Sequence, residues 1–173
     1  MRFVLAAASL AALAFAQTAS AQSVTLAPVS FAPEFQARVD NDIGADQGDV
    51  LRARVQRAIG AALARRGASV VAGAPVTIEV DVVNAVPNRV TVQQLRSRYT
   101  LDAGPTVQLG GADLHAVLRG SNGTTLAEVV YRRYDYDFTD IVGPPAMWTS
   151  ADRTIARFAE RVADAYVAQT GAR

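Results

Sequence analysis

The sequence predicts an α+β fold, with a mixed or antiparallel sheet of about four strands and two helices packed on one of its faces. Two segments, 49–66 and 149–167, repeat apolar side chains every three or four positions, as amphipathic helices do. A third segment, 76–82, alternates strictly between apolar and polar side chains, as a strand with one buried face does. The expected order of elements is β-α-β-β-β-α, which leaves the second face of the sheet to solvent or a partner.

The first 21 residues are expected to be a cleavable export signal. Arg2 precedes the apolar run Phe3–Phe15, and small residues at alternate positions end in a cleavage site after Ala21. The run is shorter than the roughly 20 apolar residues of a transmembrane helix. We therefore expect a signal peptide over 1–21 and a single domain over 22–173, periplasmic or secreted, with no transmembrane segment after cleavage.

The domain begins with a strand near residues 24–31. Val24 and Leu26 lie on one face, but Pro28 cannot donate to the ladder, so this strand is expected near an edge or with a bulge. Residues 33–48 are rich in Asp, Asn and Gly and are expected to form a polar connection.

The helix over 49–66 has clear end signals. Asp46 or Asp49 is expected to cap its start, and Gly67 to supply the left-handed residue beyond its end. Its five arginines would suit an anionic partner, although a solvated face is the favoured interpretation. They are Arg52, Arg54, Arg57, Arg65 and Arg66.

The strand over 76–82 is followed by a long segment with weak signals. Pro87 and Asn88 end the strand, and residues 88–111 contain scattered apolar positions and several glycines. A connection of this length is mobile, functional or contains a short element, and the sequence leaves the three open.

Two further strands are expected to pair as an antiparallel hairpin. Residues 112–119 alternate, 120–123 have the composition of a hairpin turn, and 126–138 return as a long strand. Apolar and charged residues run in pairs over 129–133, which predicts a bulge there. Beyond it, Thr149 and Asp152 have the spacing of a capping box for the last helix.

Composition excludes several kinds of chemistry. All 17 basic residues are arginine, and the chain has neither lysine nor cysteine. It therefore lacks a Schiff-base lysine, a Walker-type phosphate loop, a thiol nucleophile and a cysteine metal site. With 16 acidic residues against 17 basic ones, the charge is balanced, which disfavours nucleic acid as a partner. No cofactor is expected.

The sequence contains little evidence for a catalytic site or a metal site. His115 is the only histidine, and Ser121, the nearest serine, lacks a nucleophile-elbow pattern, so His115 is expected on the open face of the sheet. Asp135, Asp137 and Asp140 would converge only if the following loop folded back, and they lack the spacing of a calcium loop. We expect no catalytic residues and no metal ligands.

A run of aromatic and basic residues is the candidate partner surface. Strand alternation would place Tyr134, Tyr136 and Phe138 on one face, and aromatics with arginine are enriched at binding surfaces. Core packing under a loop or the last helix explains the same pattern, and stapling explains Trp148, so both interpretations stay open. The candidate residues are Arg132, Arg133, Tyr134, Tyr136, Phe138, Met147 and Trp148.

Several local strings resemble those of small proteobacterial envelope proteins, many of them lipoproteins of unknown function. They are Asp49-Val50-Leu51, Arg65-Arg66-Gly67, Val76 to Val82, Gly110 to Leu114, Gly120 to Glu128 and the terminal helix Trp148 to Val167. The order of elements resembles that of the lipopolysaccharide-assembly lipoproteins. This resemblance implies a mixed sheet covered by two helices and a structural, non-enzymatic role. The chain departs from that pattern because it has no cysteine to carry a lipid.

The sequence thus predicts a non-enzymatic envelope protein that acts through protein-protein interaction or assembly, with an unidentified envelope protein as its partner. The alternative is a small-molecule or lipid-binding module, whose pocket would be lined by residues 88–111 and by the face of Tyr134 to Phe138.

Overall fold

The computed structural model describes residues 22–97, 107–141 and 145–171. Within these ranges, a mixed sheet of six strands has the order β3-β1-β4-β5-β6, with β2 also paired to β4. The strands are β1 (Gln22–Leu26), β2 (Ser30–Phe31), β3 (Ala68–Val70), β4 (Val76–Val86), β5 (Gly111–Gly120) and β6 (Thr125–Tyr134). The helical segments are α1 (Pro33–Arg38), the π-helical η1 (Val39–Ile43), α2 (Ala45–Arg65), α3 (Val92–Ser97), the 3-10 turn η2 (Phe138–Asp140) and α4 (Thr149–Thr170).

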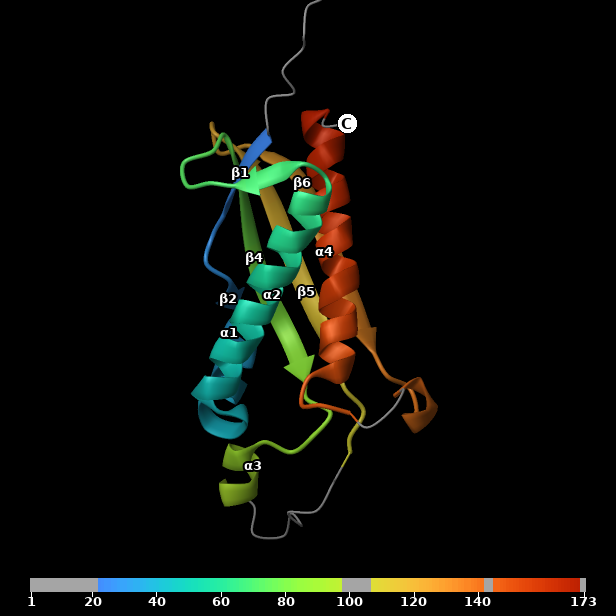
Figure 1. The fold of residues 1–173 in the computed structure, drawn as a ribbon. Helices are drawn as coiled ribbons and strands as arrows, with labels where there is room; N and C mark the ends of the chain where they lie inside the picture. The colour runs from blue at the N-terminus through green and yellow to red at the C-terminus, as the bar shows by residue number, and fades with distance from the viewer. Residues whose placement is uncertain (1–21, 98–106, 142–144, 172–173) are drawn as a thin grey trace, which may run out of the picture.

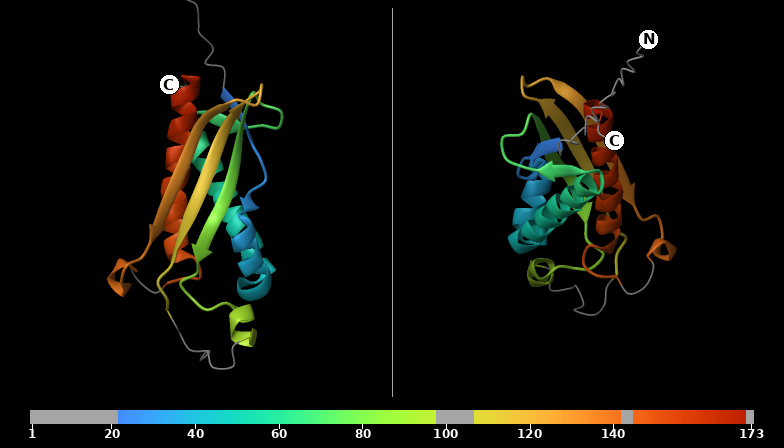
Figure 2. Two further views of the ribbon diagram at one scale, coloured as in Figure 1. Left: turned by 180° about the vertical axis from the view of Figure 1, so that it is seen from behind. Right: turned by 45° about the horizontal axis from the view of Figure 1, so that its top comes forward.

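The two long helices, α2 and α4, lie side by side on one face of the sheet (Figure 1). Seen from behind, β4, β5 and β6 present their other face, and no described helix crosses it (Figure 2). The α+β class and the two helices on one face are confirmed, but the described residues form more strands and more short helices than expected. None of the described helices combines the length and the apolar character needed to cross a membrane. The expected signal peptide, 1–21, lies outside the described residues.

The core fills the space between the sheet and these helices. β4 buries its apolar side chains as its alternation predicts, and both helices bury their predicted stripes. These residues are Val76, Ile78, Val80 and Val82 on β4, Leu51, Val55, Ile59 and Leu63 on α2, and Ile155, Phe158, Val162 and Tyr166 on α4. Burial of each large apolar side chain contributes about 1.5–3 kcal/mol to stability.

The first strand is interrupted by one extra residue. Leu26 pairs with Ile78 and Ser30 pairs with Asp81, so residues 27–29 span only two residues of β4. The bulge expected at the proline is confirmed. The position near an edge also agrees with the prediction, because only the three-residue strand β3 lies outside β1, and β2 pairs with β4 alone among the described strands.

The connection predicted over 33–48 is instead helical, formed by α1, η1 and the start of α2. Phe35, Val39 and Ile43 are fully buried at a spacing of four residues. This apolar stripe was present in the sequence, but the density of Asp, Asn and Gly around it favoured a loop.

The ends of α2 differ in how well they were predicted. The helix begins at Ala45, and neither Asp46 nor Asp49 caps it; Gly44, with φ 110°, stands at the N-cap. Gly67 follows the last turn with φ 74°, as predicted, because a left-handed residue closes the final carbonyls.

The hairpin of β5 and β6 is confirmed, but two details were wrong. Its register is continuous from Ala127 to Tyr134, so the bulge expected over 129–133 is absent and the shift lies between Leu118 and Arg119. The paired apolar and charged residues arise because β6 is an edge strand, which tolerates polar side chains on both faces. β6 also ends at Tyr134, four residues before the predicted end.

The segment after β4 contains a short element, one of the three possibilities left open. Arg89 bridges to Val107, and α3 lies between them. Residues 98–106 lie outside the described part of the chain.

The capping box expected at Thr149 and Asp152 is wrong. Trp148 stands at the N-cap of α4 without a side-chain cap, and the Thr149 hydroxyl instead accepts from the backbone N–H of Ala146 at 2.8 Å. A capping box does form in η2, between Asp137 and Asp140.

Candidate functional site

Four polar side chains meet where β4 and β6 end and α4 begins, and we call them the polar knot: Asn88, Asp135, Ser150 and Arg153. Only 4% of the Asp135 side chain is exposed. Its carboxylate accepts hydrogen bonds from the Ser150 hydroxyl, from the Gly110 amide at 3.2 Å and from Arg153 at 3.4 Å. Asn88 accepts from the Ser150 amide at 2.8 Å and donates to the carbonyl of Gln108 at 3.2 Å. A buried carboxylate with this many donors ties three elements together.

The aromatic turn, residues 136–140, projects from this knot. The Asp137 carboxylate accepts from the Thr139 amide at 2.8 Å, and the Asp140 carboxylate accepts from the Tyr136 amide at 2.8 Å. Arg153 donates to the carbonyl of Asp140 at 2.7 Å and so connects the turn to α4. The turn is therefore held by its own side chains and by the knot.

Two aromatic side chains on this turn face solvent. Tyr136 is 92% exposed and Phe138 is 61% exposed. Neither packs in the core, since both lie beyond the end of β6 at Tyr134. Figure 1 shows η2 standing away from the helices and the sheet. For these two residues the core interpretation is wrong.

A hollow of about 330 Å³ lies beside the aromatic turn. It is lined by Arg132, Arg133, Tyr134 and Tyr136, four of the seven candidate residues. Burial and the nearby carboxylate of Asp113 raise the pKa of Tyr134, so its hydroxyl stays neutral well above neutral pH. The Arg132 guanidinium lies 5.3 Å from the centre of the Tyr134 ring.

A larger groove of about 420 Å³ runs between β6 and α4, and we call it the basic groove. Arg133 contributes from β6, since its neighbour across the ladder, Ala112, faces the core. The remaining lining comes from α4. The full lining is Arg133, Arg153, Ala156, Arg157 and Glu160. Arg133 therefore borders both hollows and joins them into one surface.

The structure separates Met147 and Trp148 from this surface. Trp148 is 1% exposed and its indole N–H donates to the side-chain oxygen of Gln47 at 3.1 Å. Met147 packs against the core. Trp148 is thus a core residue that joins the start of α4 to α2, and it is not available to a partner.

His115 lies on the open face of β5, as predicted. Its ring nitrogen Nε2 is 2.7 Å from a carboxylate oxygen of Glu128 on β6. Ser121 lies in the hairpin turn at the end of β5, whereas His115 is in the middle of the strand. Glu79 and Arg119 form an ion pair on the same face of the sheet.

The three aspartates considered for calcium do not converge. Asp135 points into the polar knot, while Asp137 and Asp140 accept hydrogen bonds from the aromatic turn. Among the described residues, no group of three or more His, Cys, Asp or Glu side chains is arranged to hold a metal ion.

The sequence missed the α4 side of this surface. Arg153 and Arg157 lie in the predicted last helix, and their spacing of four residues, which places them on one face, was the only signal of a shared role. Asn88 and Ser150 carried no local signal, since they meet only where the segment after β4 lies against the start of α4. Residues 88–111 were expected to line a ligand pocket. Those that the structure describes, 88–97 and 107–111, are not among the residues that line either hollow.

Comparison with known protein families and with curated proteins finds no match. Among solved structures, the chain is similar to a PelC dodecamer from Paraburkholderia phytofirmans, with 12% identity, a TM-score of 0.46 and coverage of 81% of this chain and 84% of that one. It is also similar to protein XCC0632 from Xanthomonas campestris, described as DUF330, with 14% identity, a TM-score of 0.48 and coverage of 87% and 85%. A minor lipoprotein from Acinetobacter baumannii has 10% identity, a TM-score of 0.39 and coverage of 86% and 94%.

At these values the similarity transfers neither a partner nor an activity to this chain. The descriptions of these three structures do not name a lipopolysaccharide-assembly lipoprotein, so that finer resemblance stays a prediction.

Proposed function

We propose that this chain is an exported, non-enzymatic protein of the cell envelope that binds a protein partner through the surface around the aromatic turn. The observation that carries the proposal is the exposure of Tyr136 and Phe138 on a turn that is held in place by hydrogen bonds. The surface comprises Arg132, Arg133, Tyr134, Tyr136 and Phe138.

The energetics of exposed aromatics support this role. Tyr and Phe each bury about 150–250 Å² when covered, and Tyr and Arg are among the residues that dominate binding energy at interfaces. Here the exposed side chains contribute little to the stability of the fold itself. A surface that leaves Tyr136 and Phe138 in water gains most when a second molecule covers them.

The turn is also pre-organised for binding. Asp137 and Asp140 satisfy the backbone amides of η2, and Arg153 holds the carbonyl of Asp140. A segment that is ordered before binding loses less conformational entropy when the complex forms. The capping box therefore favours recognition by a rigid contact surface.

The polar clusters support a binding role over catalysis. His115 is paired with Glu128, and the Ser150 hydroxyl is committed to Asp135 inside the polar knot. The partner of His115 is a carboxylate and not a nucleophile, and the contact of Ser150 with Asp135 is buried away from a substrate. Both contacts can be explained by their contribution to the stability of the fold.

Site-specific photocrosslinking in the intact cell envelope tests the proposal. A photoreactive amino acid at position 136, and separately at 138, is expected to capture one and the same protein. The same probe at Ser121, in the turn at the opposite end of the sheet, serves as the control. Capture of that protein equally well from position 121, or of unrelated proteins from 136 and 138, would refute the proposal.

A further inference from the structure

The charges of α4 are divided lengthwise into two stripes. The helix has three acidic residues and three arginines in adjacent rows, each member four or eight residues from the next. The acidic row is Asp152, Glu160 and Asp164, and the basic row is Arg153, Arg157 and Arg161. Residues four apart lie on one face of a helix, so the rows point in different directions.

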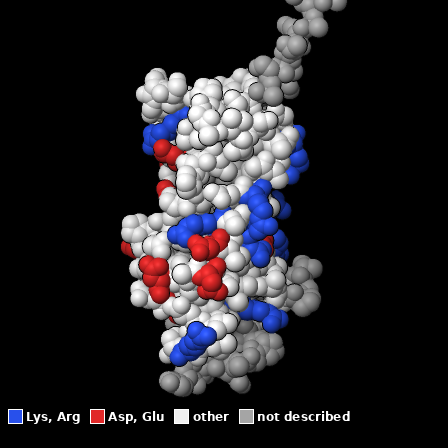
Figure 3. Space-filling model, turned by 60° about the vertical axis from the view of Figure 1, so that its left-hand side comes forward, with Lys and Arg blue, Asp and Glu red and all other residues white. Residues whose placement is uncertain are grey.

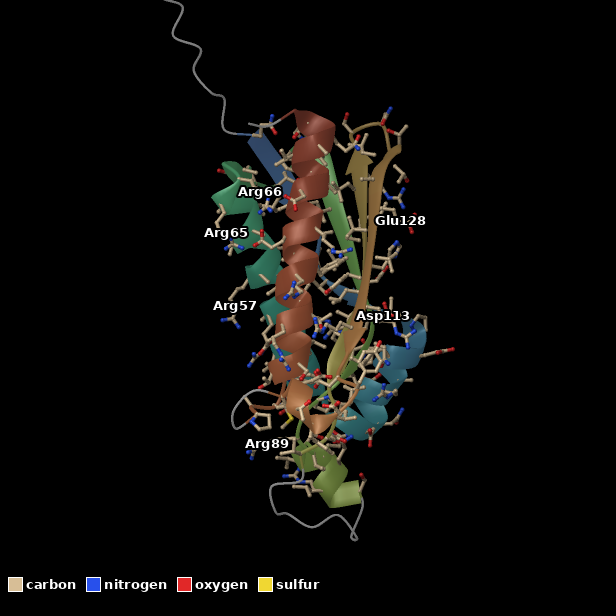
Figure 4. All side chains as sticks on the ribbon, turned by 90° about the vertical axis from the view of Figure 1, so that its right-hand side faces the viewer. Arg57, Arg65, Arg66, Arg89, Asp113 and Glu128 are labelled. Carbon is tan, nitrogen blue, oxygen red and sulfur yellow. The ribbon has the colours of Figure 1, made fainter. Side chains whose placement is uncertain are left out.

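Each acidic side chain of the row forms an ion pair with an arginine at α2 or at its C-terminal end. Asp152 pairs with Arg54, and Glu160 pairs with both Arg65 and Arg66. The second nitrogen of Arg66 is 2.6 Å from Asp164. Figure 4 shows Arg57, Arg65 and Arg66 on the α2 side of α4, with Glu128 on the opposite side of the molecule. Thus three of the arginines expected to face solvent, Arg54, Arg65 and Arg66, form ion pairs between the helices while their side chains stay partly exposed.

The basic row, in contrast, faces β6 and lacks matching acids. Arg153 reaches Asp135, whose carboxylate already serves the polar knot, and the Arg161 guanidinium lies 4.4 Å from the centre of the Tyr131 ring. Within the described part of the chain, the side chains of Arg133 and Arg157 make no ion pair or hydrogen bond. Glu160, the one acid that lines the basic groove, is neutralised by Arg65 and Arg66.

Like charges four residues apart destabilise a helix, so this row costs α4 stability unless an anion lies across it. We infer that the basic groove binds an acidic, extended segment of the protein partner. The inference rests on the proposed function and names the chemistry of that partner. The groove opens beside the aromatic turn through Arg133, so one segment can contact both.

The spacing of the arginines in the basic row of α4 matches the spacing of side chains in an extended peptide. Arginines four residues apart on a helix are separated by about 6 Å along its axis. Alternate side chains of an extended peptide lie on one side and are separated by about 6.6 Å. A segment with acidic residues at every second position therefore matches Arg153, Arg157 and Arg161 in turn, and guanidinium groups suit paired contacts with carboxylates.

The test is a fluorescence anisotropy titration of the full domain with two labelled heptapeptides of equal composition. In the first, four Glu residues alternate with three Ser residues; in the second, the four Glu residues are contiguous. We expect the alternating peptide to bind at least about fivefold more tightly and to lose affinity as salt increases, because the contacts are ionic. Equal affinity for the two peptides, or no binding of either, would overturn the inference.

Substitution of single arginines tests whether the alternating peptide binds in the basic groove. Arg157→Gln and, separately, Arg133→Gln are expected to weaken binding of the alternating peptide about tenfold, as loss of a charge-assisted contact does. Arg57→Gln is the matched control, since Arg57 is an exposed arginine on the α2 side, away from the groove. All three side chains are exposed, so circular dichroism should show the same fold. A loss in Arg57→Gln equal to that in Arg157→Gln would contradict the assignment.

Tripolyphosphate distinguishes another ligand class. If it displaces the alternating peptide at concentrations well below those of the unlabelled peptide, the groove prefers phosphate and the inference fails. Failure here leaves the proposed function intact if positions 136 and 138 still crosslink to one protein. Failure of that crosslinking with retained peptide binding would instead reject the proposed function.

Discussion

The two ends of the sheet are built by different means. At one end, which we call the knot end, β4 and β6 finish, α4 begins and the polar knot joins them. At the other, the hairpin end, β1 pairs with β3, the β5–β6 turn closes and α4 finishes, with the Tyr166 hydroxyl donating to the carbonyl of Ser23 at 3.2 Å. The segments that meet at the hairpin end, 22–27, 67–78, 120–127 and 165–171, contain no charged residue, although Arg119 donates to the Thr125 hydroxyl from the neighbouring end of β5.

Charged side chains are distributed unevenly between the two ends, and the candidate binding surface lies at the more charged one. Figure 3 shows charged side chains mainly across the middle and lower part of one side of the molecule, with fewer toward the top. The hairpin end is closed mainly by apolar packing and by hydrogen bonds of the backbone and of uncharged side chains such as Thr25 and Tyr166. The knot end buries one carboxylate, and the same Arg153 that satisfies it also supports the aromatic turn. At the knot end, therefore, the same residues stabilise the fold and support the candidate binding surface. The hairpin end contributes to stability alone.

The largest difference between the ends is expected in the free energy of unfolding when one glycine at each end is replaced by alanine. Gly111, at the knot end, has φ 153°, and a Cβ there would lie 2.6 Å from the Cα of Tyr134. Gly111→Ala combines backbone strain with overpacking and should reduce the free energy of unfolding by about 4 kcal/mol. Gly123→Ala, at φ 79° with open space around it, should cost about 1 kcal/mol. Urea denaturation of both variants measures this; equal losses would show that the ends are equally constrained.

The next effect tests the buried carboxylate. Asp135→Asn keeps the shape but replaces an acceptor with a donor that faces the Ser150 hydroxyl and the Gly110 amide. We expect a loss of about 3 kcal/mol in the free energy of unfolding, because buried donors are left unsatisfied. Asn122→Ala, which removes an exposed turn contact with Thr124 at the hairpin end, should cost at most about 1 kcal/mol. A loss from Asp135→Asn no larger than this would show that the knot is not needed for stability.

The pH dependence distinguishes the paired helices from the rest of the surface. Hydrogen bonds from Arg65 and then from Arg66 hold the pKa of Glu160 below its ordinary value of 4.5. A lowered pKa in the folded state stabilises the protein above pH 4.5, and this contribution disappears as the pH falls through the folded value. Glu160→Gln should therefore be less stable than the wild type at pH 6, with the two converging as the pH falls below 4. Thermal melts across this range provide the measurement, and a constant difference at every pH would contradict the pairing.

The smallest effect on stability is expected at the aromatic turn. Tyr136→Ala and Phe138→Ala remove side chains that face solvent, so each should change the free energy of unfolding by less than about 0.5 kcal/mol. Both should nevertheless abolish partner capture by a photoreactive group placed at the neighbouring Thr139. A loss of stability above about 1.5 kcal/mol would place these side chains in folding and not in recognition.

The parts of the fold that follow from local patterns were predictable from the sequence. The stripe of Leu51, Val55 and Ile59 identified α2, and the alternation from Val76 to Val82 identified the core strand. Gly67 marked the end of a helix because few other residues adopt φ 74° without strain. Around Phe35 and Val39, turn-forming residues surround an apolar stripe, and they predicted a connection where the structure has a helix.

The candidate surface was predictable in composition but not in arrangement. The sequence placed Arg132, Arg133 and the aromatic residues together because they are neighbours in the chain. It could not separate the exposed Tyr136 from the buried Trp148, since that depends on where β6 ends and on how α4 packs against α2. Apolar periodicity reports only that a side chain prefers a nonpolar environment, and not whether the fold provides one.

The sequence by itself determined the class of fold, the main helices and strands, and the absence of thiol and lysine chemistry. Tertiary structure alone decided which charges remain unpaired. Asp152, Glu160 and Asp164 occur beside Arg153, Arg157 and Arg161 in the chain, yet the first three pair with α2 and the others face β6. The physical reason is that an ion pair requires atoms to meet within a few ångströms, and residues separated by about 100 positions meet only when the helices pack.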